Sequence, residues 1–253
     1  MKYAAQFQLA VMMMTRLPAG RLGGAPSLGA SVWAFPLVGG IVGGLAAMVM
    51  LVVLWFGVAP ALAAGLGVLA MVVCTGGLHE DGLADVADGF GGGRDRAHKL
   101  EIMRDSQIGS YGALALILSM GLRWQGLAGV LTLAGPWTAA AALVALAMAS
   151  RAGLAAALWL MPAARSDGLG RSAAGTSADL ALISAVSGAV ALVVFFGWPG
   201  AAIAAAMAAV QVGFAALAKR QIGGQTGDVL GAMQQLAEIS GWVMISAIVY
   251  RGL

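Results

Sequence analysis

Long apolar runs alternate with short polar segments along most of the chain. Each run approaches the roughly 20 apolar residues that a helix needs to cross the hydrocarbon core of a bilayer. The pattern predicts an all-α, polytopic membrane helix bundle with about seven transmembrane helices, in a single integral membrane domain covering residues 1–253. The predicted spans, of which the last is the weakest, are 34–57, 59–78, 109–131, 137–161, 180–197, 200–218 and 235–250.

The first residues carry a different pattern. The apolar stretch from Phe7 to Met14 follows Lys2 and is closed early by Arg16, and no small-residue cleavage site comes after it. A secretory signal peptide would need such a site. We therefore predict an amphipathic N-terminal helix that lies at the membrane interface.

Eight of the 14 basic residues lie in the polar segments that separate pairs of spans, at 79–108, 162–179 and 219–234, whereas the turns between them carry no charge. If successive spans pair as hairpins, these segments share one face with Arg16 and Arg21. The positive-inside rule assigns that face to the cytoplasm. Arg123 does not fit this scheme, because it lies within the third run. The alternative is that residues 123–125 form an outer turn.

The composition supports lipid as the solvent for most of the chain. Hydrophobic residues make up 60% of the sequence and charged residues only 10%, outside the usual soluble range. Fourteen basic residues and a net charge of +3 read as topology signals, and no nucleic-acid partner is expected. The single cysteine, Cys74, excludes a disulfide framework within one chain. Whether the chain forms a homo-oligomer stays open.

Acidic residues are concentrated in one segment, where seven of the 11 lie between Glu80 and Asp105. Asp81, Asp85 and Asp88 recur at intervals of four and three, so in a helix they lie within about 60° of one another. Such carboxylates repel one another unless a cation holds them, and hard oxygen ligands suit magnesium, manganese or calcium. We predict a metal site here, with Glu80 as a further ligand. The alternative is a solvated acidic helix end.

A glycine-rich loop and basic residues follow the acidic helix. Residues 89–93 let the backbone approach an anion, and Arg94 and Arg104 match phosphate oxygens. Beside a divalent cation, this combination predicts a pyrophosphate site for phosphoryl transfer. Arg151 is a third candidate, because a charge inside a span usually faces the bundle interior or a wet cavity. Further carboxylates in the polar segments of the same face are candidates for a shared cleft, namely Asp105, Asp167 and Asp228.

Four motifs in this order resemble the cobalamin synthase family, the adenosylcobinamide-GDP ribazoletransferases. They are residues 76–89, 102–112, 165–170 and 226–231, with further matches at 15–18 and 35–39. The resemblance spans nearly the whole chain and implies a bacterial inner-membrane enzyme whose active site faces the cytoplasm. It implies transfer of the adenosylcobinamide-phosphate group from adenosylcobinamide-GDP to a hydroxyl of α-ribazole, or of α-ribazole 5′-phosphate, with GMP as the leaving group.

The roles expected for the candidate residues follow from this reaction. Mg²⁺ on the acidic helix bridges the donor pyrophosphate, with Asp81 and Asp85 also counted as catalytic. Either His79 or Asp105 assists deprotonation of the acceptor hydroxyl. Substrate contacts are expected from Arg94, Arg104, Arg151, Asp167 and Asp228.

The sequence also has features of two other functional classes. The chain looks distantly like the CDP-alcohol phosphotransferases of phospholipid synthesis, but Asp85 follows residues 81–84 where those enzymes have arginine. A secondary transporter would place carboxylates near mid-span and show two related halves. The acids of this chain instead gather at one membrane face, and no such halves are evident.

Overall fold

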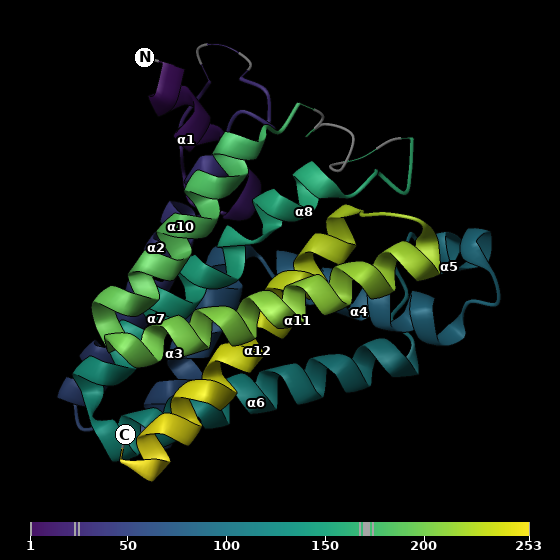
Figure 1. The fold of residues 1–253 in the computed structure, drawn as a ribbon. Helices are drawn as coiled ribbons and strands as arrows, with labels where there is room; N and C mark the ends of the chain where they lie inside the picture. Colours follow the sequence, from purple (N-terminus) through teal and green to yellow (C-terminus); the bar gives the residue numbers. More distant parts are fainter. Residues whose placement is uncertain are drawn as a thin grey trace.

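The computed structural model describes the chain except residues 1, 23, 25, 167, 169–172, 174 and 253. The described part is helical and contains no strand, only one isolated bridge between Ala163 and Gln225. Figure 1 shows α2, α7 and α10 running together, with α6, α11 and α12 extending toward α5. The helices are α1 Lys2–Met14, η1 Val32–Ala34, α2 Phe35–Trp55, α3 Pro60–Thr75, α4 Leu78–Gly92, α5 Arg96–Ile102, α6 Ser110–Ala134, α7 Pro136–Ala152, α8 Leu154–Leu160, α10 Ala178–Phe196, α11 Trp198–Ile222 and α12 Gly227–Arg251.

The predicted all-α bundle is confirmed, and so is the N-terminal helix. Among the residues that the structure describes, five helical segments are long and apolar enough to cross a membrane, or six if a bent pair counts as one span. The five are α6, α10, α11, α2 together with η1, and α7 together with α8. The seventh predicted run lies within α12, whose buried face carries Gln234, Gln235 and Glu238.

The second predicted span, 59–78, corresponds to α3, which ends in a sharp bend before α4. α3 has only 16 residues, about 24 Å of helix, and α4 leaves it at an angle of 87°. Gly76 and Gly77 make this turn, with φ of +67° and +72°. Only glycine adopts two such left-handed conformations in succession without strain. The bend keeps the acidic helix next to the bundle rather than letting it continue along α3.

The alternative outer turn at residues 123–125 is wrong. α6 continues without a break to Ala134, and the connection to α7 is made at Gly135, where φ is +85°. Arg123 is only 1% exposed. A charge can lie at this depth because the neighbouring helices supply opposite charges, as described below.

The charged segments pack against one another at one end of the bundle, as the charge pattern predicts. Arg96, in α5, donates to the carbonyl oxygen of Ala164 at 3.1 Å. Lys99 donates to Gln221 at the end of α11. Arg165 donates to the carbonyl oxygen of Leu100 at 3.1 Å.

The opposite end of the bundle carries exposed aromatic side chains. They are Trp55 at the end of α2, Trp137 and Trp198 at the starts of α7 and α11, and Tyr250 near the end of α12, all at least 76% exposed. Trp and Tyr are enriched where a bilayer meets water, because their rings are apolar and their tips polar. The separation of the charged end from the aromatic end marks the two faces of a membrane protein.

Paired glycines bring α2 directly against α7. A Cβ atom at Gly39 would lie 2.1 Å from the carbonyl oxygen of Ala147, and one at Gly43 would lie 2.5 Å from that of Leu143. No side chain fits at either position. These glycines therefore serve helix packing, which in lipid depends on close backbone contact.

Candidate active site

Glycines also set the closest contact between α4 and α12. A Cβ atom at Gly82 would lie 2.8 Å from the backbone oxygen of Asp228, and one at Gly231 would lie 3.2 Å from the backbone of His79. This crossing places the carboxylates of α4 opposite the first turn of α12. Asp81 is exposed at the crossing, and Asp85 and Asp228 are partly buried.

The carboxylates at this crossing repel one another. Burial is the main cause that raises the pKa of Asp85, and the negative charges of Asp81 and Asp228 raise it further, to about 7. The positive charge of Arg165 opposes this shift only in part. α4 is not among the five segments that are long and apolar enough to cross a membrane on their own. A cation between these carboxylates would relieve the repulsion.

Asp228 is held in place by its neighbours. Its Oδ2 accepts hydrogen bonds from Arg165 Nη1 at 3.3 Å and from the hydroxyl of Thr226 at 3.2 Å. The same hydroxyl caps α12 by accepting from the backbone N–H of Val229 at 3.2 Å. An N-cap residue therefore orients the carboxylate toward α4.

Asp88 is engaged with another helix. Its two oxygens accept the backbone N–H groups of Gly109 at 2.8 Å and Gly112 at 2.9 Å. A Cβ atom at either glycine would lie within 2.4 Å of that carboxylate. Asp88 therefore anchors the start of α6 to α4 and lies apart from the crossing with α12.

Glu80 points into the bundle, away from the exposed Asp81. Its Oε1 accepts from Arg123 Nη1 at 2.7 Å and from Gln235 at 3.0 Å. The guanidinium of Arg123 also donates from Nε to Glu238 at 3.0 Å. The structure thus assigns Glu80 to a buried ion-pair network and not to the carboxylates at the crossing. The charged partners in this network, Arg123 and Glu238, are absent from the predicted site.

The other predicted substrate-binding residues have different surroundings. Arg151 is 2% exposed, donates to its own helix at the carbonyl oxygen of Ala147, 3.0 Å away, and has an Nε without a partner among the described residues. Arg94 and Arg104 are exposed at the charged end. Asp105 accepts the backbone N–H of Gln107 at 3.0 Å in an exposed turn. Asp167 lies outside the described residues.

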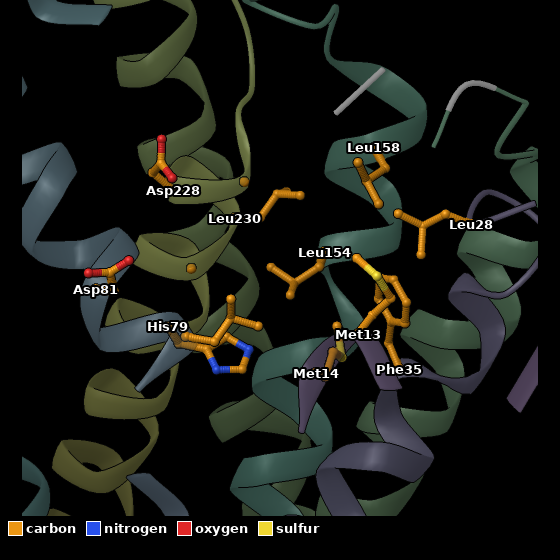
Figure 2. A pocket seen from close by; sticks show the side chains of 13 residues that line it. Met13, Met14, Leu28, Phe35, His79, Asp81, Leu154, Leu158, Asp228 and Leu230 are labelled. Carbon is orange, nitrogen blue, oxygen red and sulfur yellow. The ribbon is translucent and has the colours of Figure 1, made fainter. Parts of the chain in front are cut away.

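An apolar cavity of about 130 Å³ adjoins the crossing of α4 and α12. Figure 2 shows Asp81 and Asp228 on one side of it and methionine, leucine and phenylalanine side chains on the other, with His79 between them. His79 is 3% exposed, and its ring forms no hydrogen bond with any residue that the structure describes. Of the two expected bases, only His79 lines this cavity.

A second, polar hollow of about 430 Å³ lies at the charged end. Its polar lining comes from Glu101, Arg104, Arg165 and Ser166. Arg165 of this hollow forms an ion pair with Asp228, which lines the apolar cavity. The two spaces are therefore neighbours, linked by one ion pair.

No group of three or more His, Cys, Asp or Glu side chains within the described part of the chain is arranged to enclose a metal ion. Magnesium does not require such a group. It is commonly held by one or two carboxylates, with substrate phosphates and water completing the octahedron. Asp81 and Asp85, one helical turn apart and facing Asp228, fit this donor set.

Comparison with known proteins identifies the family. Residues 6–246 match the family described as cobalamin-5-phosphate synthase. A protein of Mesorhizobium japonicum named adenosylcobinamide-GDP ribazoletransferase is 47% identical, over 92% of this chain and 89% of its own. One of the same name from Bradyrhizobium diazoefficiens is 45% identical, over 93% and 90%. No solved structure matches the chain. The chain therefore belongs to the cobalamin-5-phosphate synthase family.

Proposed function

We propose that this chain is an adenosylcobinamide-GDP ribazoletransferase, which completes the nucleotide loop of cobalamin. The observation that carries the proposal is the meeting of Asp81, Asp85 and Asp228 where α4 crosses α12, next to an apolar cavity that Asp81 and Asp228 line, in a chain 47% identical to a protein of that name. The comparisons give no support to phospholipid synthesis or to transport.

The reaction transfers a substituted phosphoryl group. A hydroxyl oxygen of α-ribazole, or of its 5′-phosphate, attacks the phosphorus that carries adenosylcobinamide. The bond from that phosphorus to the oxygen of GMP breaks, GMP leaves with the bonding electron pair, and the hydroxyl proton is lost. We assign acceptance of this proton to His79, because its ring lines the cavity and has no protein partner in the described structure.

Asp81 and Asp85 are the residues that we propose to hold Mg²⁺, with Asp228 completing the negative wall opposite them. When bound, the ion would neutralise the donor pyrophosphate and the charge that develops on the departing phosphate. Asp88 contributes indirectly, because its bonds to Gly109 and Gly112 fix α6 against the acidic helix.

Arginines at the charged end are suited to hold the donor. Arg104 and Arg165 line the polar hollow next to Asp228, and planar guanidinium groups bind phosphate oxygens in pairs. We include Arg94, which is exposed at the same end. Arg151 lines neither hollow, so we assign it to the buried network rather than to substrate.

The proposed function is tested by GMP release in membranes that contain the chain. Adenosylcobinamide-GDP and α-ribazole together should give GMP and a cobalamin product in equal amounts, whereas omission of either substrate should give none. Membranes from cells without the chain provide the background. Release of GMP that does not depend on α-ribazole would contradict the assignment as a transferase.

Replacing Arg94 or Arg104 by lysine should lower turnover about tenfold, because a paired, planar donor becomes a point charge. Arg220→Lys is the matched control, since Arg220 is exposed in the last turn of α11 and no role is proposed for it. Initial rates at several donor concentrations measure the effect. Equal rates in all three variants would show that Arg94 and Arg104 do not bind the donor.

We further propose that the charged end faces the cytoplasm, because the positive-inside rule applies to the segments that pack there. In a Cys74→Ala background, Arg96→Cys and Gln221→Cys should react with an impermeant maleimide only after the cells are opened. Trp198→Cys, at the aromatic end, should react in intact cells. Labelling of Arg96→Cys in intact cells would show that the charged end faces outward, opposite to the proposed orientation.

A further inference from the structure

We propose that the apolar cavity binds the aromatic base of the acceptor nucleoside. This inference rests on the proposed function and names the part of the substrate that the cavity takes. The base of α-ribazole is a benzimidazole, a flat and largely apolar ring system. Its ribose would then extend toward the carboxylates where the phosphoryl group is transferred.

The cavity has the size and the lining for one ring system. Its volume is about 130 Å³, and an apolar cavity of about 150 Å³ is known to accept benzene. The wall that faces away from the acids consists of six side chains: Met13, Met14, Leu28, Phe35, Leu154 and Leu158. Figure 2 shows these side chains turned toward one common space.

The chemistry of the lining selects the acceptor base over other parts of the two substrates. The guanine of the donor presents several hydrogen-bond donors and acceptors at its edge, and burying them without partners would be costly. The corrin of the donor is much larger than the cavity. A benzimidazole presents mostly carbon, so its burial against methionine and leucine is favourable.

Polar groups occur only on the side of the cavity where the ribose would emerge. His79 is 3% exposed and lacks a hydrogen-bond partner among the described residues. A buried imidazole of this kind is available to a ligand. With the base against the leucines, a ribose hydroxyl would pass His79 on its way to Asp81 and Asp228, which also line the cavity.

The six side chains of the wall that faces away from the acids come from segments other than α4 and α12. Met13 comes from α1 and Leu158 from α8, whereas Asp81 and Asp228 come from α4 and α12. Substitutions in the wall can therefore change binding of the acceptor without touching the groups that act on phosphate. This separation makes the inference testable by steady-state kinetics.

The test fills the cavity from α8. Leu158→Trp should raise the KM for α-ribazole by at least about tenfold, since the indole occupies the space of the base, while the KM for adenosylcobinamide-GDP stays within about twofold. Leu160→Trp is the matched control, because Leu160 is 65% exposed on the same helix and does not line the cavity.

A second pair of variants covers the case in which Leu158→Trp fails to fold. Met13→Trp fills the cavity from the peripheral helix α1, and Met12→Trp is its control, with Met12 43% exposed and outside the lining. The same rise in the KM for α-ribazole, confined to Met13→Trp, is expected.

Two results would overturn the inference. One is an unchanged KM for α-ribazole in a folded, active Leu158→Trp or Met13→Trp variant, which would leave the cavity to a lipid chain. The other is an equal rise in the KM of both substrates. Failure of the proposed function looks different, because the unaltered chain would then release no GMP in the presence of α-ribazole.

Discussion

Replacing Asp85 by asparagine is expected to lower turnover by at least about a hundredfold, and Asp81→Asn should do the same. Asparagine keeps the shape of the side chain but removes the charge that would hold Mg²⁺ at the crossing of α4 and α12. A hundredfold loss corresponds to about 3 kcal/mol of transition-state stabilisation. GMP release by purified protein, with graded Mg²⁺ and then with EDTA, measures the effect.

Asp179→Asn serves as the control for these variants, because Asp179 is exposed in the first turn of α10. It should keep the rate of the unaltered chain. Asp88→Asn should change the Mg²⁺ dependence of turnover less than these two variants do. It should weaken the attachment of α6 to α4, since Asp88 accepts hydrogen bonds from Gly109 and Gly112. Activity that survives both EDTA and the Asp85 substitution would eliminate the metal-dependent mechanism.

Arg123→Met should give the largest loss of stability. Arg123 is the only side chain in the described structure that bonds to both Glu80 and Glu238, and all three are buried. Removing one partner of a buried ion pair typically costs about 3 to 5 kcal/mol, because the remaining charge stays buried without compensation. The fraction of detergent-solubilised protein that stays monodisperse on heating measures this loss.

The double variant Arg123→Met with Glu238→Gln separates charge balance from lost packing. It removes one charge of each sign, so it should recover part of the stability that Arg123→Met loses. Arg220→Met, at an exposed position, should behave as the unaltered chain. If the double variant is no more stable than Arg123→Met, charge compensation does not account for the stability that Arg123 provides.

The membrane helices could be predicted because a helix that crosses a bilayer requires a long run of apolar residues. Apolar length identified α2, α6, α10 and α11 within a few residues of their ends. The bend between α3 and α4 was not predicted, although Gly76 and Gly77 stand at it. Glycine pairs are also common in straight helix contacts, such as those of Gly39 and Gly43, so the pair alone does not reveal a turn.

The sequence predicted the positions of the acidic residues along α4 but not their partners on other helices. The spacing of Asp81 and Asp85 reports positions on one helix, and both do face the crossing. Spacing says nothing about partners from distant helices, so the contacts of Glu80 with Arg123 could not be foreseen. The one available signal was Arg123 itself, a charge in an apolar run that must find a buried counter-charge.

Asp88 also shows that spacing along a helix does not reveal the partners of a side chain. Its position on the acidic face suggested a metal ligand, but its oxygens are bonded to the start of α6. A carboxylate that caps a neighbouring helix and one that awaits a cation have the same sequence spacing. Only the placement of Gly109 and Gly112 distinguishes them.

The buried ion pairs also constrain the order in which the chain can mature. Glu80, Arg123 and Arg151 belong to α4, α6 and α7, whereas Glu238 belongs to α12, which follows all three in the chain. Until α12 packs against these helices, two positive charges face a single negative one within the interior of the bundle. A chain in which α12 has not yet packed therefore carries an uncompensated buried charge, a state that quality-control proteases can recognise. α12 thus balances the buried charges of the bundle and also contributes Asp228 to the candidate active site.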